Sequence, residues 1–403
     1  MRCQICDDDK LFKFLDLGEH PACIFPREGQ LKDEKRFKLD VHYCPTCGLI
    51  QLGHPVDQDI LFGDDYHHIA ALSSSFKEHL KELAAATAAK FKLGAGDLVV
   101  ELGSNDGALL EAYLPHKVKV LGVDPSDVSQ IAIDKGIPTL REFFNEGLAA
   151  KMAKEHGKAK LMASLNTFAH VSNLDSFVRG VRDLLTDDGV FVTESHYALD
   201  LINDLQYDFI YHEHSRYYTV RTLVYLFAKH GLEVFDVVRI PTHSGSIRVF
   251  AGKKGAHPVA KIVGELLAAE KAAGLENTDT YVAFAKKVAE HKTAFVKFLK
   301  DIRAKGSRIA GLTFPARAVT LLNYCGIGPE TLDCITEMST LKIGRYSPGT
   351  HIKVVDQEML FREGAPEYGL LLSWHIQKEI LPRFKAKGFK GKFILPLPQP
   401  TIV

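Results

Sequence analysis

The densest group of proton-exchanging side chains in the sequence lies in one short segment, Tyr211-His212-Glu213-His214. Histidine titrates near neutral pH, and tyrosine and glutamate can do so when their pKa values shift, so the segment suits general acid and base catalysis. In an extended strand Tyr211 and Glu213 would share one side and the two histidines the other, although a loop would relax this alternation. A zinc-binding or structural histidine pair is the alternative, and the adjacent glutamate and tyrosine favour catalysis.

A second polar segment follows at Pro241-Thr-His-Ser-Gly-Ser-Ile-Arg248, where His243, hydroxyl groups and Arg248 surround a glycine. Arginine binds anionic oxygens through paired hydrogen bonds, so this group suits an anionic, hydroxylated ligand. A polar turn without a ligand is the alternative. We predict that His243 and Arg248 bind substrate.

Cysteines occur in two close pairs, Cys3-Gln-Ile-Cys6 and Cys44-Pro-Thr-Cys47, with 37 residues between them. Four thiolates make up the tetrahedral set that zinc prefers, and such a set leaves no coordination position open for catalysis. We therefore predict a structural zinc site at Cys3, Cys6, Cys44 and Cys47. Cys23 is expected in an apolar core rather than as a fifth ligand. A zinc module also raises nucleic-acid binding, but the chain lacks a basic face with interleaved aromatic residues.

A glycine-rich turn follows a short apolar strand at 97–102 and leads into a predicted helix at 108–113. In a doubly wound sheet such a turn lies at the carboxyl end of the first strand, where nucleotides bind. Glu101 and Asp106 would repel the pyrophosphate of a dinucleotide, whereas the cationic methionine portion of S-adenosylmethionine tolerates them. Asp124 ends the next strand, 23 residues after Glu101, where an acid can accept both ribose hydroxyl hydrogens. A tight turn without a ligand is the alternative.

Two further predicted strands, 160–166 and 189–194, end on the same rim of the sheet. Their ends bring Asn166, His170, Glu194 and His196 near the cofactor, although a histidine in such a place is more often packed or solvated than catalytic. The predicted cofactor-binding residues are Glu101, Gly103, Asn105, Gly107, Asp124 and Asn166.

The C-terminal part of the sequence predicts two amphipathic helices within 258–303 and then a second α/β unit. Its strands are expected at 308–312, 368–374 and 392–396. Two segments rich in glycine and hydroxyl groups, 320–328 and 343–351, are expected to be loops between these strands. We predict that they bind substrate through Asn323, Tyr324, Arg345 and His351.

The composition is that of an ordinary globular protein, with 46% hydrophobic and 25% charged residues over 403 positions. The 50 basic and 50 acidic residues give a net charge of zero, hence no general attraction to nucleic acid or to an anionic membrane. No apolar run approaches the ~20 residues that a bilayer requires, and the N-terminus lacks the apolar core of a secretion signal. We expect a cytoplasmic monomer or dimer with a small-molecule substrate.

Three blocks of sequence together resemble the sugar C-methyltransferases that act on keto-deoxysugar nucleotides. The blocks are the cysteine module through Cys44-Pro-Thr-Cys-Gly-Leu-Ile-Gln-Leu52; the motifs Glu101-Leu-Gly-Ser-Asn-Asp-Gly107, Asn166-Thr-Phe-Ala-His170 and Tyr211-His-Glu-His214; and the motifs Thr320-Leu-Leu-Asn-Tyr-Cys-Gly-Ile-Gly328 and Gly344-Arg-Tyr-Ser-Pro-Gly-Thr-His351. The resemblance implies a Rossmann-like methyltransferase domain at 66–252 that uses S-adenosylmethionine. A four-cysteine zinc module at 1–65 and a second Rossmann-like α/β domain at 253–403 would flank it.

The resemblance also implies the roles of individual residues. His214 would be the base, with Tyr211 and Glu213 supporting it, and His170 and Tyr66 would complete the active site. The chain departs from the family in three places. It has Gly311-Leu-Thr-Phe-Pro-Ala-Arg-Ala318 where the family usually has Gly-Tyr-Gly-Ala-Pro-Ala-Lys-Gly, Ser215-Arg216 where an aromatic and a small residue are common, and His68 in place of an aromatic residue.

Methylation of a sugar carbon requires a neighbouring carbonyl, because only then is the carbon's proton acidic. In a 4-keto sugar nucleotide carbon 3, or carbon 5, is acidified, and we expect methylation at carbon 3. A base would remove the proton, and the enolate carbon would attack the sulfonium methyl. Methylation at oxygen or nitrogen of another metabolite, and a non-catalytic sugar-nucleotide binding protein, are the alternatives.

Overall fold

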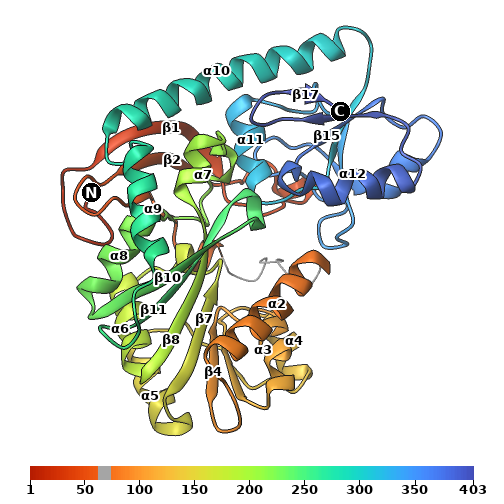
Figure 1. The fold of residues 1–403 in the computed structure, drawn as a ribbon. Helices are drawn as coiled ribbons and strands as arrows, with labels where there is room; N and C mark the ends of the chain where they lie inside the picture. Colours follow the sequence, from red (N-terminus) through yellow and green to blue (C-terminus); the bar gives the residue numbers. More distant parts are fainter. Residues whose placement is uncertain (62–73) are drawn as a thin grey trace.

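The protein consists of three β-sheets and the helices that cover them (Figure 1). The structure is a computed structural model, and it describes residues 1–61 and 74–403. The long helix α10 (Thr278–Arg303) runs along the top of the view and joins the N-terminal sheet to the C-terminal domain. It packs on β1 (Phe12–Pro21) and on α11 (Arg317–Cys325). In the described part of the chain, no helix is long and apolar enough to cross a membrane.

The N-terminal sheet is antiparallel, with the strand order β1-β2-β3-β9. Strands β2 (Arg36–Tyr43) and β3 (Ile50–Leu52) flank the second cysteine pair, and the short α1 (Gln58–Leu61) follows them. The fourth strand, β9 (Arg216–Tyr217), comes from far along the chain and pairs with β3. The cysteine module therefore shares its sheet with the residues that follow His214.

The central sheet has seven strands in the order β10-β11-β8-β7-β4-β5-β6, and β11 runs antiparallel to both of its neighbours. Its strands are β4 (Leu98–Leu102), β5 (Lys119–Val123), β6 (Thr139–Leu140), β7 (Ala159–Leu165), β8 (Leu185–His196), β10 (Leu232–Ile240) and β11 (Ser246–Lys253). The helices are α2 (Ser74–Lys90), α3 (Ala108–Tyr113), α4 (Ser129–Asp134), α5 (Glu146–His156), α6 (Leu174–Leu184), α7 (Ala198–Asn203) and α8 (Val220–Lys229). Every residue of β4 is buried, as expected of a parallel strand with both faces covered. The strand order reverses between β4 and β7, which puts the ligand crevice at their carboxyl ends.

The C-terminal domain contains a second sheet with the order β14-β13-β12-β15-β16-β17, parallel except for β17. Its strands are β12 (Ile309–Leu312), β13 (Cys334–Glu337), β14 (Val354–Asp356), β15 (Tyr368–Leu371), β16 (Lys392–Leu395) and β17 (Thr401–Ile402). Helix α9 (Lys261–Ala272) precedes α10, and α12 (Gln377–Ala386) precedes β16. The predicted fold class is therefore confirmed, whereas the domain boundaries stay a prediction, since the first of them lies outside the described residues.

One predicted loop of this domain is wrong. Residues 320–325 belong to α11, because Ala318, Leu321, Leu322 and Cys325 recur at helical spacing and are all buried. Gly326 adopts a left-handed conformation (φ 63°) and ends the helix. Glycine here marks the end of a helix and not the middle of a ligand loop.

Candidate active site

The turn after β4 and the acid after β5 are in direct contact. Asp124 accepts hydrogen bonds from Asn105 N (2.8 Å) and Ser126 N (2.9 Å). The turn has left-handed backbone at Gly103 (φ 78°) and Asn105 (φ 49°), and Gly107 (φ 75°) starts α3. A Cβ atom at Gly103 would clash with the side chain of Thr167, so the close approach of the two segments requires glycine.

Two carboxyl oxygens at this rim, Glu101 Oε2 and Asp106 Oδ1, are buried and have no hydrogen-bond partner among the described residues. Burial, followed by the charges of Asp124 and Asp106, raises the pKa of Glu101 well above its ordinary value. A buried acceptor without a partner is costly unless a ligand satisfies it. The positive charges and hydroxyl donors of S-adenosylmethionine fit this set of acceptors.

Glu194 of β8 lies fully buried between two basic groups. Arg248 Nε donates to its Oε1 (2.6 Å), and His79 Nε2 of α2 donates to its Oε2 (2.7 Å). Burial alone would raise the pKa of Glu194, but the bonds from His79 and Arg248 lower it. Arg248, predicted to bind substrate, is thus engaged by a protein carboxylate. His79 could not be predicted from a local motif, because this pair joins residues 115 apart. The backbone N–H of Asn166 (φ 54°) donates to the carbonyl of Glu194 at 2.9 Å.

Tyr211 and His214 lie side by side, contrary to the alternation of an extended strand. The segment forms a turn in which His214 N donates to Tyr211 O (3.0 Å) and the Tyr211 hydroxyl lies 2.8 Å from His214 Nε2. His212 points away and donates to the carbonyl of His20 (3.0 Å) in the N-terminal sheet. The Glu213 carboxyl faces the backbone of Cys23, and burial raises its pKa to about 7.

His170 completes a compact group with this turn. Its ring centroid lies 4.9 Å from that of His214, and its Nδ1 donates to the carbonyl of Glu213. Burial, followed by the charges of His170 and of other nearby groups, holds the pKa of His214 well below its ordinary value. The predicted pair of histidines therefore comes together, with a neutral His214. Tyr66 lies outside the described residues.

Two further histidines lie beside the group of Tyr211, His214 and His170. Neither was predicted to be catalytic or to bind a ligand. His196 stacks on Phe209 (3.8 Å between ring centroids), whose other neighbours include His214 at 4.8 Å. His375 of the C-terminal domain stacks parallel to His243 at 6.4 Å. Burial lowers the pKa of His196 to about 3 and that of His375 well below its ordinary value. His375 comes from a distant segment of the chain, whereas His196 is the last residue of β8.

A buried ion pair joins the segment before the Tyr211–His214 turn to the C-terminal domain. Arg317 of α11 donates two hydrogen bonds to Asp208 (2.8 and 2.7 Å), and Trp374 Nε1 donates a third (2.8 Å). Asp208 directly precedes Phe209, and the Arg317 guanidinium lies over the Phe209 ring (4.9 Å). The pair thereby fixes the segment that leads into the Tyr211–His214 turn.

The four predicted substrate residues of the C-terminal domain contact other protein segments. Asn323 Nδ2 donates to the carbonyls of Val319 (2.8 Å) and Pro348 (3.0 Å), and the Tyr324 ring lies beneath Lys292 (4.4 Å). Arg345 donates to Phe25 O (3.1 Å), and His351 lies 2.5 Å from Glu34 Oε2. The latter two contacts hold the 343–351 loop against the N-terminal module. A role of these four side chains in substrate binding stays a prediction.

The four predicted metal ligands converge. The thiols of Cys3, Cys6, Cys44 and Cys47 all lie within 4.8 Å of one another, with 3.4 Å between Cys3 and Cys47 and between Cys6 and Cys44. Tetrahedral zinc with bonds of about 2.3 Å requires sulfur atoms roughly 3.8 Å apart. The cluster therefore fits a zinc ion closely. Cys23 does not belong to it.

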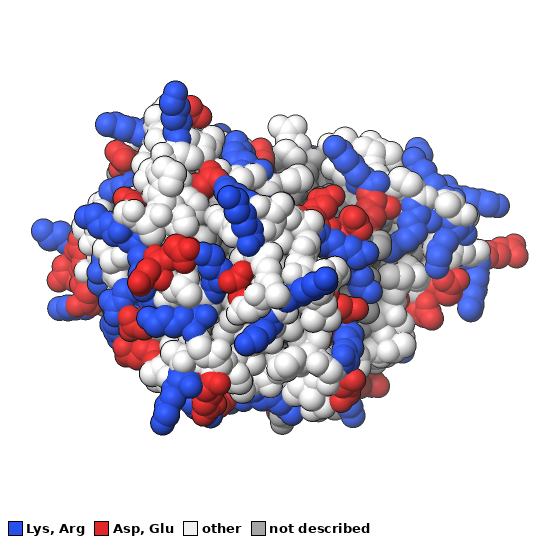
Figure 2. Space-filling view, turned by 60° about the horizontal axis from the view of Figure 1, so that its bottom comes forward, with Lys and Arg blue, Asp and Glu red and all other residues white. Residues whose placement is uncertain are grey.

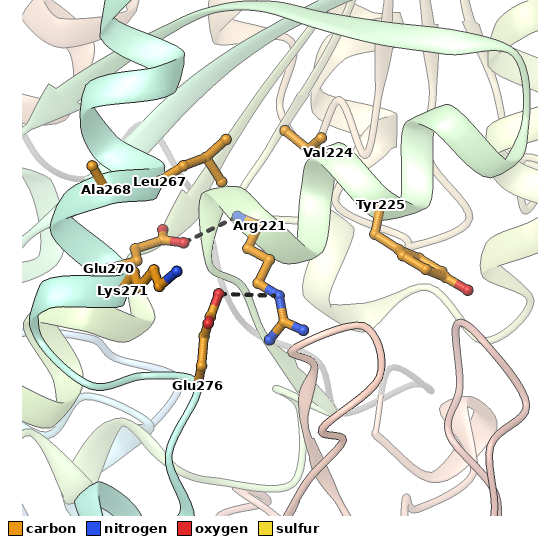
Figure 3. A pocket seen from close by; sticks show the side chains of 8 residues that line it. All are labelled: Arg221, Val224, Tyr225, Leu267, Ala268, Glu270, Lys271 and Glu276. Carbon is orange, nitrogen blue, oxygen red and sulfur yellow. Dashed lines mark hydrogen bonds and ion pairs between the residues drawn. The ribbon is translucent and has the colours of Figure 1, made fainter.

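A surface pocket of about 470 Å³ lies away from this active site, between α8 and α9 (Figure 3). Its acid Glu270 accepts hydrogen bonds from Arg221 N (3.1 Å), Val220 N (2.6 Å) and the Tyr197 hydroxyl (2.8 Å). The Arg221 side chain reaches the carbonyls of Pro45 (2.9 Å) and Thr46 (3.1 Å). Glu270 and Arg221 are thus bonded to the protein, and Arg221 links the pocket to the second cysteine pair.

Three family models match consecutive parts of the chain. They are described as "Putative zinc binding domain" (residues 3–62), "Methyltransferase domain" (76–237) and "C-methyltransferase C-terminal domain" (241–398). The C-methyltransferase NovU of Streptomyces niveus is 33% identical over 408 residues, which cover 100% of this chain and 96% of NovU. The chain belongs to the C-methyltransferase family. It is an S-adenosylmethionine-dependent enzyme that methylates carbon, which sets aside methylation at oxygen or nitrogen and a purely binding role.

Solved methyltransferases show weaker similarity to this C-methyltransferase. Magnesium protoporphyrin IX methyltransferase of Synechocystis PCC 6803 is 12% identical, with a TM-score of 0.34 and coverage of 44% of this chain and 79% of the other. An S-adenosylmethionine-dependent methyltransferase of Clostridium acetobutylicum ATCC 824 is 13% identical, with a TM-score of 0.35 and coverage of 44% and 92%. At these values the similarity supports no conclusion about substrate.

The surface of the C-methyltransferase carries both charges. Figure 2 shows Lys and Arg interspersed with Asp and Glu over the face in view, in keeping with the 50 basic and 50 acidic residues. Interspersed charges of this kind favour no polyanion over a small ligand.

Proposed function

We propose that the protein methylates carbon 3, next to the ketone, of a 4-keto-deoxysugar nucleotide, and that it works in the cytoplasm. The observation that carries this proposal is the hydrogen-bonded Tyr211–His214 pair, with His170 beside it. A neutral imidazole beside a phenol supplies both the proton acceptor and the hydrogen-bond donor that carbon methylation next to a ketone requires.

The sugar carbon becomes a nucleophile only as an enolate. In the proposed first step His214 Nε2 takes the proton from carbon 3, and the electron pair of that C–H bond moves into the enolate. Because Nε2 has one lone pair, the Tyr211 O–H has to leave it first: the hydroxyl turns to the ketone oxygen when the sugar binds, and it then donates to the enolate oxygen while Nε2 holds the proton. S-adenosylmethionine supplies the electrophilic methyl group on its sulfonium and leaves as S-adenosylhomocysteine.

The residues proposed to hold the methyl donor are the two rim acids and the turn between them. Asp124 would accept the ribose hydroxyls, while Glu101 would face the positive methionine portion. Gly103, Gly107, Asn105 and Asn166 would supply backbone and amide contacts. This set places the positive methionine portion of the donor near the unsatisfied carboxyl oxygen of Glu101, and its ribose hydroxyls near the charged Asp124.

Exchange with solvent deuterium tests the proposed substrate and reaction. The wild-type enzyme, incubated in deuterium oxide with a 4-keto-deoxysugar nucleotide, should wash deuterium into carbon 3, and with S-adenosylmethionine it should place a methyl group there. Nuclear magnetic resonance distinguishes carbon 3 from carbon 5. A product methylated at carbon 5 would correct the position, and no turnover of any 4-keto sugar nucleotide would refute the substrate class.

We also propose that the four-cysteine cluster holds a structural zinc ion. Replacing Cys44 with serine removes one thiolate of a closed site, and metal binding of this kind is folding free energy. The C44S variant should lose stoichiometric zinc, melt at a lower temperature and give less soluble protein. A metal-free variant with wild-type melting behaviour would contradict the assignment.

A further inference from the structure

Arg216 is a buried cation at the border between the cysteine cluster and the catalytic turn. Only 4% of its surface is exposed, and in β9 it lies opposite Gln51. The Gln51 side chain bonds to Gln4 N (2.9 Å) and Arg2 O (3.2 Å), on either side of Cys3. Directly opposed residues of paired strands project from the same face. The Arg216 side chain therefore extends toward the first cysteine pair, close enough for its charge to interact with Cys3.

The partners of Arg216 leave its charge uncompensated by any carboxylate. Its hydrogen bonds run to the carbonyls of Val171 and Ser172, to the Ser215 hydroxyl and to the side chain of Tyr218, and no acid pairs with it in the described part of the chain. A buried charge is costly without a counter-charge. Four thiolates around a divalent ion carry a net negative charge, which is what this guanidinium lacks.

The same side chain also holds the backbone around His170. Arg216 Nη1 donates to Val171 O and Nη2 to Ser172 O (3.2 Å), while the Ser215 hydroxyl donates to Ala169 O (2.8 Å). The two residues that directly follow His214 thus fix the chain on both sides of His170. Ser215-Arg216 is also a place where the chain departs from the family pattern.

We propose that Arg216 is a positioning residue that couples the four-cysteine metal site to the catalytic histidines. Its guanidinium balances the negative charge of the metal-bound thiolates and, with Ser215, holds the His170 loop against the His214 turn. This coupling rests on the proposed roles of His170 and His214, and it deepens the proposed function by joining the metal module to the reacting groups.

The test measures zinc retention and turnover on the same full-length, zinc-loaded variants. Zinc release to a chromogenic chelator is followed without substrate, and kcat and KM are then measured with affinity for S-adenosylmethionine as a further readout. Arg216→Met removes the charge and both donors, so zinc should leave about 10–100-fold faster and kcat should fall by a similar factor. Affinity for S-adenosylmethionine should stay within about twofold, since the rim residues are untouched.

Three further variants separate the two halves of the proposal. Ser215→Ala removes the hydrogen bond to the Ala169 carbonyl and no charge, so it should lower kcat and leave zinc release unchanged. Arg216→Lys keeps the charge but has no fork for two carbonyls, so it should retain zinc better than Arg216→Met and still turn over slowly. Arg179→Met, the control, breaks a surface ion pair with Glu146 and should change neither readout.

Arg216→Met with wild-type zinc release, or with wild-type kcat, would overturn the coupling. If that variant does not fold, wild-type kcat in both Ser215→Ala and Arg216→Lys would overturn it. The proposed function is judged separately, by exchange and methylation in the wild-type enzyme alone. Zinc release does not depend on the sugar, so its outcome remains informative if the substrate class proves wrong.

Discussion

The hydrogen bond between Tyr211 and His214 determines which nitrogen can take up a proton. In the proposed mechanism the tyrosine hydroxyl donates across this 2.8 Å contact at rest, so that Nε2 is the acceptor and the neutral ring carries its hydrogen on Nδ1. Burial holds the pKa of His214 well below its ordinary value, which keeps the ring neutral but makes it a weak base at rest. A developing enolate next to the ring favours the imidazolium, so its basicity rises as negative charge forms.

We expect His214→Asn to lower kcat by about 10²–10⁴-fold, the usual contribution of a general base. Affinity for S-adenosylmethionine, measured by calorimetry, should stay near that of the wild type because the rim carboxylates are unchanged. His156→Asn, an exposed histidine at the end of α5, is the matched control and should leave kcat unchanged. Full deuterium exchange by His214→Asn would move the base to Tyr211, His170 or His243.

Asp124 is expected to distinguish the methyl donor from the sugar nucleotide. Asp124→Asn keeps the shape of the side chain but removes the charge that accepts the ribose hydroxyls, and hydrogen bonds to charged groups contribute about 1.5–3 kcal/mol. Affinity for S-adenosylmethionine should therefore fall roughly 10–100-fold, while affinity for the sugar nucleotide changes little. Separate titrations of the two ligands measure this, with the exposed Asp134→Asn as control. Selective loss of sugar-nucleotide affinity would refute the role of Asp124.

At the scale of elements, the cofactor crevice was predictable because its signals are local. A buried apolar run, a glycine turn and an acid at the next strand end lie within 97–124, and β4, α3 and β5 form where these signals predict them. The turn at Tyr211–His214, in contrast, could not be predicted. Alternation failed at 211–214 because His212 is drawn to the His20 carbonyl of the N-terminal sheet, which turns the backbone and leaves Tyr211 beside His214.

Elements that depend on distant partners could not be predicted from local patterns in the sequence. Strand β9 has two residues, which are too few for a periodic pattern, and it forms by pairing with the edge of β3. Arg317 was noted as a departure from the family, but its buried partner Asp208 lies 109 residues earlier. Arginine differs from lysine in that its planar fork bonds both carboxylate oxygens, which explains the residue once Asp208 is known.

The Asp208–Arg317 pair should therefore stabilise the contact between the catalytic turn and the C-terminal domain. Arg317→Met leaves a buried carboxylate with Trp374 as its one remaining donor among the described residues, and breaking such a pair typically costs about 3–5 kcal/mol. The free energy of unfolding in urea should fall by that order. The double variant Asp208→Asn/Arg317→Met should recover part of the loss, because no uncompensated charge remains. Additive losses in the double variant would show that the two residues act independently.

At the scale of the whole molecule, the proposed reacting groups lie where the three sheets meet. The central sheet is followed by the proposed cofactor rim and His170, the N-terminal sheet holds the Tyr211–His214 turn through β9, and the C-terminal domain contributes Arg317 and His375. As a result of this convergence, several histidines are buried and stay neutral. Burial lowers the pKa of His20 and of His212 to about 4, and that of His196 to about 3.

These buried histidines should make the folded protein sensitive to acid. Above the ordinary histidine pKa of 6.5 both the folded and the unfolded chain hold them neutral. As the pH falls below that value only the unfolded chain takes up protons, until the folded pKa values near 4 are reached, so stability is lost between about pH 6.5 and 4. For His212 alone the loss from pH 6.5 to 5 is on the order of 2 kcal/mol, at about 1.4 kcal/mol per pH unit.

His212→Gln tests this contribution, because glutamine can still donate to the His20 carbonyl but does not titrate. We expect the free energy of unfolding in urea to fall less between pH 7 and 5 in this variant than in the wild type, whatever its stability at pH 7. Loss of zinc in acid affects both proteins alike and cancels in the comparison of slopes. His156→Gln, at an exposed position, should keep the wild-type slope. An unchanged slope in His212→Gln would mean that His212 is protonated in the folded protein, and the contact between the N-terminal sheet and the catalytic turn would then be looser than the 3.0 Å hydrogen bond to His20 implies.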